Sequence, residues 1–193
     1  STPMKEMNRR EFLTLTGASV ALLALAACGS TPSTPVAPAG SKEAELVAAI
    51  NKVWKKKYEA NEVAHEQLIL NQDAVGAIRA HGRVFEEANE TPHTLNDSDN
   101  KLIFGELNGL EDKIRNKYGK DSLAGMAGIS EPSPNRVVAL EDAYSCEDAA
   151  VRAFVAKLLD NSNSAKAEFI SIYCPVVQGK TYMTAVVFRN NKA

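Results

Sequence analysis

The end of the chain carries two β-rich runs, whereas the segments before them carry helical patterns. Residues 169–177 and 181–188 are rich in β-branched and aromatic side chains, and the Gln-Gly-Lys between them is typical of a hairpin turn. Because no βαβ unit repeats, we predict an α+β fold in one domain, with helices in the first part and a β-hairpin at the C-terminus. Apolar residues at three- and four-residue spacing predict helices over 43–58, 71–89, 107–118 and 146–159.

The polar and helix-breaking residues between these helices predict the connections. Residues 96–100 read as a polar turn, and residues 102–104 form a short apolar run. Residues 121–136 are rich in Gly, Ser, Pro and Ala, which predicts a long loop. Ser145 is expected to cap the last helix.

The first 27 residues have the pattern of an export signal. Arg9 and Arg10 precede an uncharged stretch that ends in Leu-Ala-Ala-Cys at Cys28, and this order of basic, apolar and small residues is typical of a signal peptide. The arginine pair resembles a twin-arginine signal, and Leu-Ala-Ala-Cys resembles a bacterial lipobox. We therefore expect residues 1–27 to be removed and Cys28 to be lipidated. An ordinary secretory signal with two chance arginines is the alternative.

A flexible tether follows this cysteine. Residues 28–42 are rich in Pro, Ser and Thr, a composition that favours an extended, solvated chain. Acyl chains on Cys28 would hold the protein on a membrane. The expected organisation is a signal peptide at 1–27, a lipidated tether at 28–42 and a folded domain at 43–193. The expected location is the bacterial cell envelope, facing the periplasm or the exterior.

The cysteine count agrees with this location. The chain has three cysteines, and lipidation of Cys28 leaves Cys146 and Cys174. Two cysteines outside the cytoplasm usually pair, so we predict a disulfide between them. It would close a loop of about 29 residues and contribute roughly 3 kcal/mol. Two free thiols, or a catalytic Cys146 at a helix start, are the alternatives.

Composition and motifs exclude several classes of function. The 22 basic and 24 acidic side chains give a net charge of −2, so nucleic acid is not an expected partner. The 45% hydrophobic content is sufficient for a packed core. The sequence contains no Gly-x-Ser-x-Gly, no Walker-type loop and no Gly-x-Gly-x-x-Gly.

Four short motifs between residues 43 and 188 point to one family. Residues 46–51 are similar to a Leu-Leu-x-x-Ile-Asn helix start, and the in-helix His81 with the later His93 is similar to a paired-histidine motif. Glu106 lies in a Gly-Glu-Leu-Asn that is similar to Gly-Glu-Asn, and residues 179–188 are similar to a closing strand. On these motifs the chain resembles a degenerate member of the CAP superfamily (cysteine-rich secretory, antigen 5 and pathogenesis-related 1 proteins). The resemblance implies a three-layer α-β-α sandwich.

The chain also departs from that family. Phe154 stands where a Trp is expected, and residues 161–165 contain no histidine. The two-histidine, two-glutamate cleft of the family is therefore incomplete, with His93 and Glu106 as its remaining half.

His81, His93 and Glu106 are the candidate metal ligands. Imidazole and carboxylate are suitable zinc ligands, and an open zinc site needs three of them. Alternatively, His81 packs at the edge of its helix and His93 lies on an exposed loop. We assign no catalytic residue and no cofactor, with a divalent metal such as zinc as the alternative.

These expectations favour a membrane-anchored lipoprotein with a non-catalytic binding domain. Its expected partners are the membrane, through the lipid, and a small ligand, lipid or envelope protein. A metal-assisted or thiol hydrolase of the envelope is one alternative, and a structural subunit of an envelope complex is another.

Overall fold

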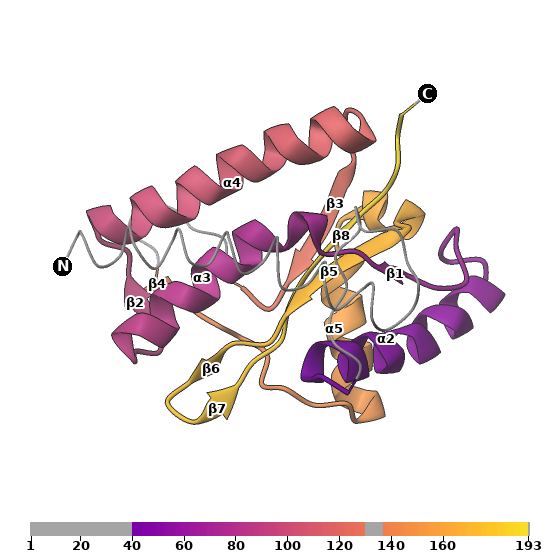
Figure 1. Cartoon of the computed structure of the whole chain (residues 1–193). Coiled ribbons are helices and arrows are strands. Elements are labelled where there is room, and N and C mark those ends of the chain that lie inside the picture. The colour runs from indigo at the N-terminus through magenta and orange to yellow at the C-terminus, as the bar shows by residue number, and fades with distance from the viewer. Residues whose placement is uncertain (1–39, 130–136, 193) are drawn as a thin grey trace.

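The computed structural model describes residues 40–129 and 137–192. The predicted signal peptide, Cys28 and most of the tether lie outside these residues. Helices form the larger part of the first half, and the longest strands come later (Figure 1). The helices are α2 (Lys42–Glu59), η1 (Gln72–Ala74), α3 (Val75–Ala88), α4 (Asp97–Tyr118), α5 (Asp148–Leu158) and η2 (Ser162–Lys166).

The main sheet has four strands in the order β1-β5-β8-β3. Strand β5 lies parallel to β1 and antiparallel to β8, and β8 lies antiparallel to β3. Two short antiparallel pairs, β2 with β4 and β6 with β7, lie outside this sheet. The strands are β1 (Ile69–Leu70), β2 (His93–Thr94), β3 (Leu123–Ala127), β4 (Val137–Val138), β5 (Phe169–Tyr173), β6 (Val176–Val177), β7 (Lys180–Thr181) and β8 (Thr184–Phe188). The α+β prediction and the C-terminal hairpin are thus confirmed.

The predicted first helix matches α2 closely. Ser41 caps it by accepting a hydrogen bond from the backbone N–H of Ala44 at 3.2 Å. Glu43 and Glu45 lie in the first turn, where the helix dipole favours negative charge. The apolar spacing buries one stripe of the helix, namely Leu46, Val47, Ile50, Val53 and Trp54.

The third predicted helix begins ten residues too late, because α4 starts at Asp97 rather than Leu107. Residues 96–100 are not a free polar turn, because they form the first turn of this helix. The Asn96 side chain accepts from the Asp99 backbone N–H, and the Asp99 carboxylate accepts from the Asn96 backbone N–H. This reciprocal capping box explains why a polar run starts a helix.

The loop predicted over residues 121–136 is also partly wrong. Leu123–Ala127 forms β3, which pairs with β8 at Leu123 and again from Gly125 to Ala127, with a register shift between them. Its small residues give no β-propensity pattern, so its neighbours in the sheet determine its conformation. Ser145 does not cap α5 either, because Glu147 is the N-cap residue and Ser145 accepts only from the Glu147 backbone N–H.

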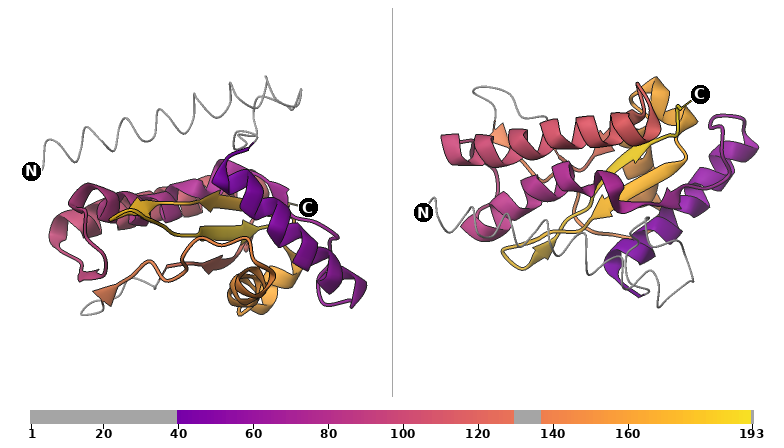
Figure 2. Two further views of the ribbon diagram at one scale, coloured as in Figure 1. Left: turned by 90° about the horizontal axis from the view of Figure 1, so that it is seen from below. Right: turned by 45° about the horizontal axis from the view of Figure 1, so that its top comes forward.

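Helices cover both faces of the sheet (Figures 1 and 2). Side chains alternate along β8, so Ala185 and Val187 pack against α2 and α5, whereas Val186 and Phe188 pack against α3 and α4. Strand β5 alternates in the same way, with Ile170 on the first face.

A buried polar network lies on the α3–α4 face. The Asp73 carboxylate accepts hydrogen bonds from Lys117 Nζ at 2.7 Å and from the Tyr118 hydroxyl at 2.6 Å. The Tyr118 oxygen in turn accepts from Asn71 Nδ2 at 2.8 Å. The Ser171 hydroxyl, on β5, donates to the Asn71 backbone carbonyl. These bonds attach the start of α3 and the end of α4 to the sheet.

Candidate functional site

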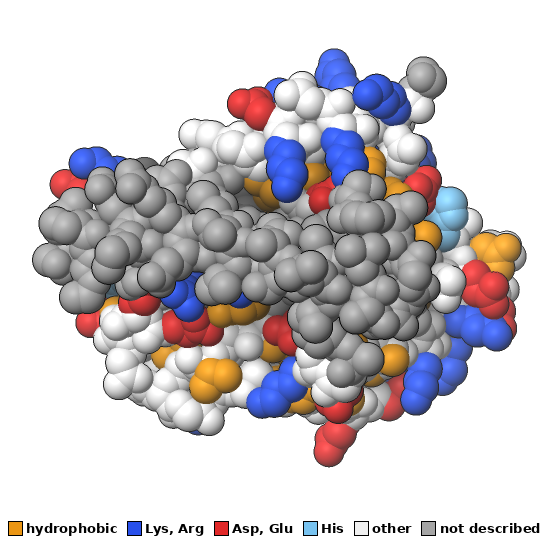
Figure 3. All heavy atoms as spheres, viewed as in Figure 1, with side chains coloured by type: hydrophobic (Ala, Val, Ile, Leu, Met, Phe, Trp, Pro, Cys, Tyr) orange, Lys and Arg blue, Asp and Glu red, His pale blue; other side chains and the backbone are white. Residues whose placement is uncertain are grey.

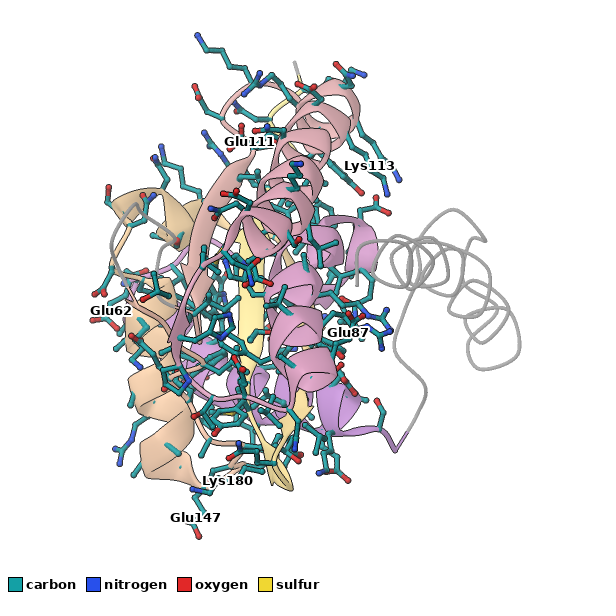
Figure 4. The ribbon with its side chains drawn as sticks, turned by 90° about the vertical axis from the view of Figure 1, so that its left-hand side faces the viewer. Glu62, Glu87, Glu111, Lys113, Glu147 and Lys180 are labelled. Carbon is teal, nitrogen blue, oxygen red and sulfur yellow. The ribbon has the colours of Figure 1, made fainter. Side chains whose placement is uncertain are left out.

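A cavity of about 850 Å³ opens along β3. Consecutive residues from Leu123 to Ile129 form one wall. Leu110 and Glu111 of α4 line one side, and Lys157 and Asp160 at the end of α5 line the other. Figure 4 shows Glu111 on α4, on the side of the helix nearest to β3.

Two glycines give this wall its shape. A Cβ at Gly125 would collide with the Ser164 hydroxyl and the Leu158 carbonyl, so only glycine lets the end of α5 approach the strand. Gly128 has a φ of +88°, and a Cβ there would collide with the Met183 carbonyl. Larger residues at these positions would force β3 away from its neighbours.

The rim of the cavity carries more acidic than basic groups. Lys157 Nζ donates to Asp142 at 2.8 Å and lies 3.7 Å from Glu141. Burial by itself lowers the pKa of Lys157, but the hydrogen bond to Asp142 and the nearby carboxylates outweigh it and raise the pKa. Among the described residues, Glu111 and Asp160 make no ion pair. The cavity therefore favours a positively charged ligand.

Basic side chains gather elsewhere on the surface. Figure 3 shows Lys and Arg side chains over the end of the molecule where α4 finishes, and the last turn of α4 contains Arg115 and Lys117. These cations match the helix dipole at its C-terminus.

The candidate metal ligands lie on three different elements. His81 lies on α3, is only 2% exposed and lines the cavity. His93 lies in the short strand β2, and Glu106 lies in α4 with its side chain outside the described part of the structure. Of the three, only His81 is placed at the cavity.

Carboxylates flank His93. Its Nε2 lies 3.0 Å from Asp99 Oδ2, and its Nδ1 lies 3.3 Å from Glu90 Oε2. The ring also meets the Phe85 ring edge to face, at 4.9 Å between centroids. His93 is therefore partly buried in a packed corner beside the capping box of α4, where it links β2 to that helix. His65 is half-exposed, 3.6 Å from Glu168.

Among the side chains that the structure describes, which do not include that of Glu106, no group of three His, Cys, Asp or Glu is placed to hold a metal ion. Within the same residues, no helix combines the length and hydrophobicity needed to cross a bilayer.

Both described cysteines are free thiols near the first turn of α2. Cys146 is exposed, and its thiol donates to the Tyr144 hydroxyl at 3.3 Å. Cys174 is buried, and its backbone N–H donates to Glu43 Oε1 at 3.2 Å. Burial raises the pKa of the Cys174 thiol, and the negative charge of Glu43 raises it further. Cys174 is thus a poor nucleophile, whereas Cys146 is accessible.

Sequence reasoning did not find the cavity. Its wall is the strand that was predicted as loop, and its acidic rim comes from residues that are distant in sequence. The one available indication was Gly125 and Gly128 within a run of small residues, because glycine marks close backbone approach.

Searches against protein-family models, curated proteins and solved structures give no significant match.

Proposed function

We propose that this chain is a lipid-anchored, extracytoplasmic binding protein of the bacterial envelope, whose CAP-like domain takes up a ligand in the cavity beside β3. The observation that carries this proposal is the cavity itself, which is large enough for a small ligand and has an apolar strand as its wall. A small ligand, a lipid or a segment of an envelope protein would suit it.

The order of the elements supports the CAP-like part of the proposal. The four-stranded mixed sheet lies between α2 and α5 on one face and α3 and α4 on the other, as a three-layer α-β-α sandwich requires. His81, one of the motif histidines, lines the cavity in this arrangement.

Binding is favoured over metal-assisted hydrolysis because His93 does not line the cavity and its Nε2 is hydrogen-bonded to Asp99 at 3.0 Å. Its Nδ1 lies 3.3 Å from Glu90 Oε2 but makes no hydrogen bond within the described residues. We expect zinc titrations of the native protein and of His93→Ala and His81→Ala to give the same weak binding. Tight zinc binding that either substitution abolishes would instead favour the hydrolase.

A dye-binding experiment tests the cavity. Nile red, a neutral apolar dye, should bind the protein, and Met126→Trp should weaken the binding because the indole would fill part of the cavity. Met126 lines the cavity and is 36% exposed, so the larger ring has room. Tyr58→Trp is the matched control, because Tyr58 is 43% exposed and lies outside the cavity. Equal dye binding by all three proteins would contradict the proposal.

Mass spectrometry of the protein from bacterial membranes tests the anchor. A mature N-terminus at Cys28 with the added mass of acyl chains is the expected result. An unmodified N-terminus at another residue would refute the anchor and leave the cavity unaffected.

The predicted disulfide belongs to the same proposal. Both cysteines are connected to the first turn of α2. The Cys146 thiol donates to the Tyr144 hydroxyl, which donates to Glu45, and the Cys174 backbone N–H donates to Glu43. Protein recovered from an oxidising compartment should contain no titratable thiol from this pair, and its reduction should cost roughly 3 kcal/mol of stability. Two titratable thiols in the exported protein would show that the bridge does not form.

A further inference from the structure

Strand β3 is at one edge of the main sheet, and no other described strand pairs with its outer edge. Within the described residues, β3 pairs only with β8, and no other backbone hydrogen bond reaches Leu123–Ala127. In an antiparallel pair, alternate residues direct their N–H and C=O groups away from the partner. Such an edge is a template on which another extended chain can form hydrogen bonds.

The cavity lies where an added strand would run. Its wall is formed by consecutive residues of β3 and the two that follow, so it is extended along the strand. Five residues of strand offer about 17 Å of edge, enough to pair with a short extended peptide. The opposite edge of the sheet differs, because β1 has only Ile69 and Leu70.

The side chains around this edge indicate what kind of peptide would fit. Glu111 on α4 and Asp160 on the α5 side make no ion pair within the described residues, whereas Lys157 is paired with Asp142 and Glu141. Met126 contributes an apolar surface, 36% exposed, on the strand itself. Successive side chains of an extended peptide point to opposite faces of the sheet, so basic side chains at neighbouring positions would reach Glu111 on one side and Asp160 on the other.

We propose that β3 accepts an extended basic segment of a partner protein as an added strand. The main chain of the segment pairs with the outer edge of β3, and its Lys or Arg side chains reach Glu111 and Asp160. This inference rests on the proposed function, because it assigns an occupant to the same cavity.

Defined peptides test the two parts of this proposal separately. The probe is a fluorescein-labelled decapeptide in which pairs of Lys alternate with pairs of Val (the Lys-Val peptide), so that Lys side chains point to both faces. Its binding to the full chain is followed by fluorescence anisotropy. The same peptide with Glu in place of every Lys (the Glu-Val peptide) tests charge. A Lys-Val peptide that is N-methylated at every residue tests strand addition, because it has no N–H group on either edge. We expect the Lys-Val peptide to bind, and each modified peptide to bind at least about tenfold more weakly.

Surface substitutions supply the matching test on the protein. The double variant Glu111→Lys with Asp160→Lys should weaken Lys-Val binding about tenfold and restore binding of the Glu-Val peptide. Glu59→Lys makes the same kind of charge change at an exposed residue outside the cavity, and it should leave both peptides unchanged.

Several outcomes would overturn the proposal. Equal binding of the N-methylated peptide would exclude strand addition, and an unaffected double variant would exclude the acidic rim. Self-association that Met126→Arg abolishes would assign the edge to a second copy of this chain. If Nile red still enters the cavity while no peptide binds, the proposed function stands and only the strand-addition inference fails.

Discussion

The two faces of the sheet are stabilised by different kinds of contact. On the α2–α5 face, Trp54, Phe154 and Ile170 belong to one continuous apolar cluster. On the α3–α4 face, apolar side chains share the space with the buried network around Asp73 and Tyr118. Apolar contacts have no preferred direction, whereas a hydrogen bond requires its donor and acceptor at a particular distance and angle. The second face therefore determines where α3 starts and where α4 ends on the sheet.

This comparison predicts two different responses to substitution. The apolar face should lose stability in proportion to the volume removed. The polar face should lose stability in proportion to the buried groups left without partners.

The largest effect is expected for Trp54 on the apolar face. Trp54 is fully buried, so Trp54→Ala should cost about 3–5 kcal/mol of unfolding free energy. Trp54 Nε1 makes no hydrogen bond within the described residues, so Trp54→Phe should cost about 1.5 kcal/mol or less. Urea denaturation followed by circular dichroism measures both. Similar losses for both variants would mean that a polar contact of the indole, rather than its volume, stabilises this face.

On the polar face, Asp73→Ala should cost about 2–3 kcal/mol. The substitution leaves Tyr118 and Lys117 without their shared acceptor. Asp112→Ala is the matched control, because Asp112 is an exposed carboxylate on α4, and it should change stability by less than about 0.5 kcal/mol. If both variants unfold at the same urea concentration, the network does not hold α4 in place.

The same network predicts a loss of stability in alkali. Burial raises the pKa of Tyr118 above its ordinary value of 10.0, and the hydrogen bond to Asp73 raises it further. The hydrogen bond to Asp73 also raises the pKa of Lys117 above 10.5, in spite of burial. A raised pKa means that the folded state holds its proton more tightly than the unfolded state. The stabilisation is therefore complete below about pH 10 and is lost as pH rises through the folded-state values.

Tyr118→Phe isolates this effect. The excess stability of the native protein over Tyr118→Phe should be constant between about pH 8 and 9.5 and should shrink above pH 10. Tyr173 and Cys174, whose pKa values burial also raises, are present in both proteins and cancel in the difference. A difference that grows in alkali would reverse the assigned sign.

The smallest effects are expected at the helix caps, one for each face. Asn96→Ala removes one half of the capping box of α4 and should cost about 1 kcal/mol. Ser41→Ala removes a single cap bond of α2 and should cost less, because no reciprocal bond is lost. Thermal unfolding of the two variants gives the comparison, and a larger loss for Ser41→Ala would contradict it.

The sequence predicted elements whose local pattern and tertiary environment agree. Helix α2 has a cap, acidic residues in its first turn and one apolar stripe, so its bounds differ from the prediction by one residue at each end. The hairpin was also predicted, from the Gln-Gly-Lys that separates two β-rich runs. In the structure Gln178 and Gly179 both adopt the positive φ angles that a two-residue hairpin turn requires.

The sequence prediction failed where local and tertiary preferences differ. The polar run at residues 96–100 has the composition of a turn, yet the Asn96–Asp99 capping box makes it a helix start. Leu123–Ala127 has little β-propensity, yet β8 pairs with it. The candidate metal set was assembled from motif similarity and stays a prediction, with His81 lining the cavity and the side chain of Glu106 outside the described part of the structure.

The sequence by itself determined the α+β class, the bounds of α2 and the C-terminal hairpin, because these depend on periodicity, caps and turn residues close together in the chain. Only the tertiary structure decided that β3 is the edge strand of the described sheet, that Asp73 meets Lys117 and Tyr118, and that acidic side chains line the rim of the cavity. These features join residues far apart in sequence, so their contacts stabilise the fold only after the helices have packed on the sheet.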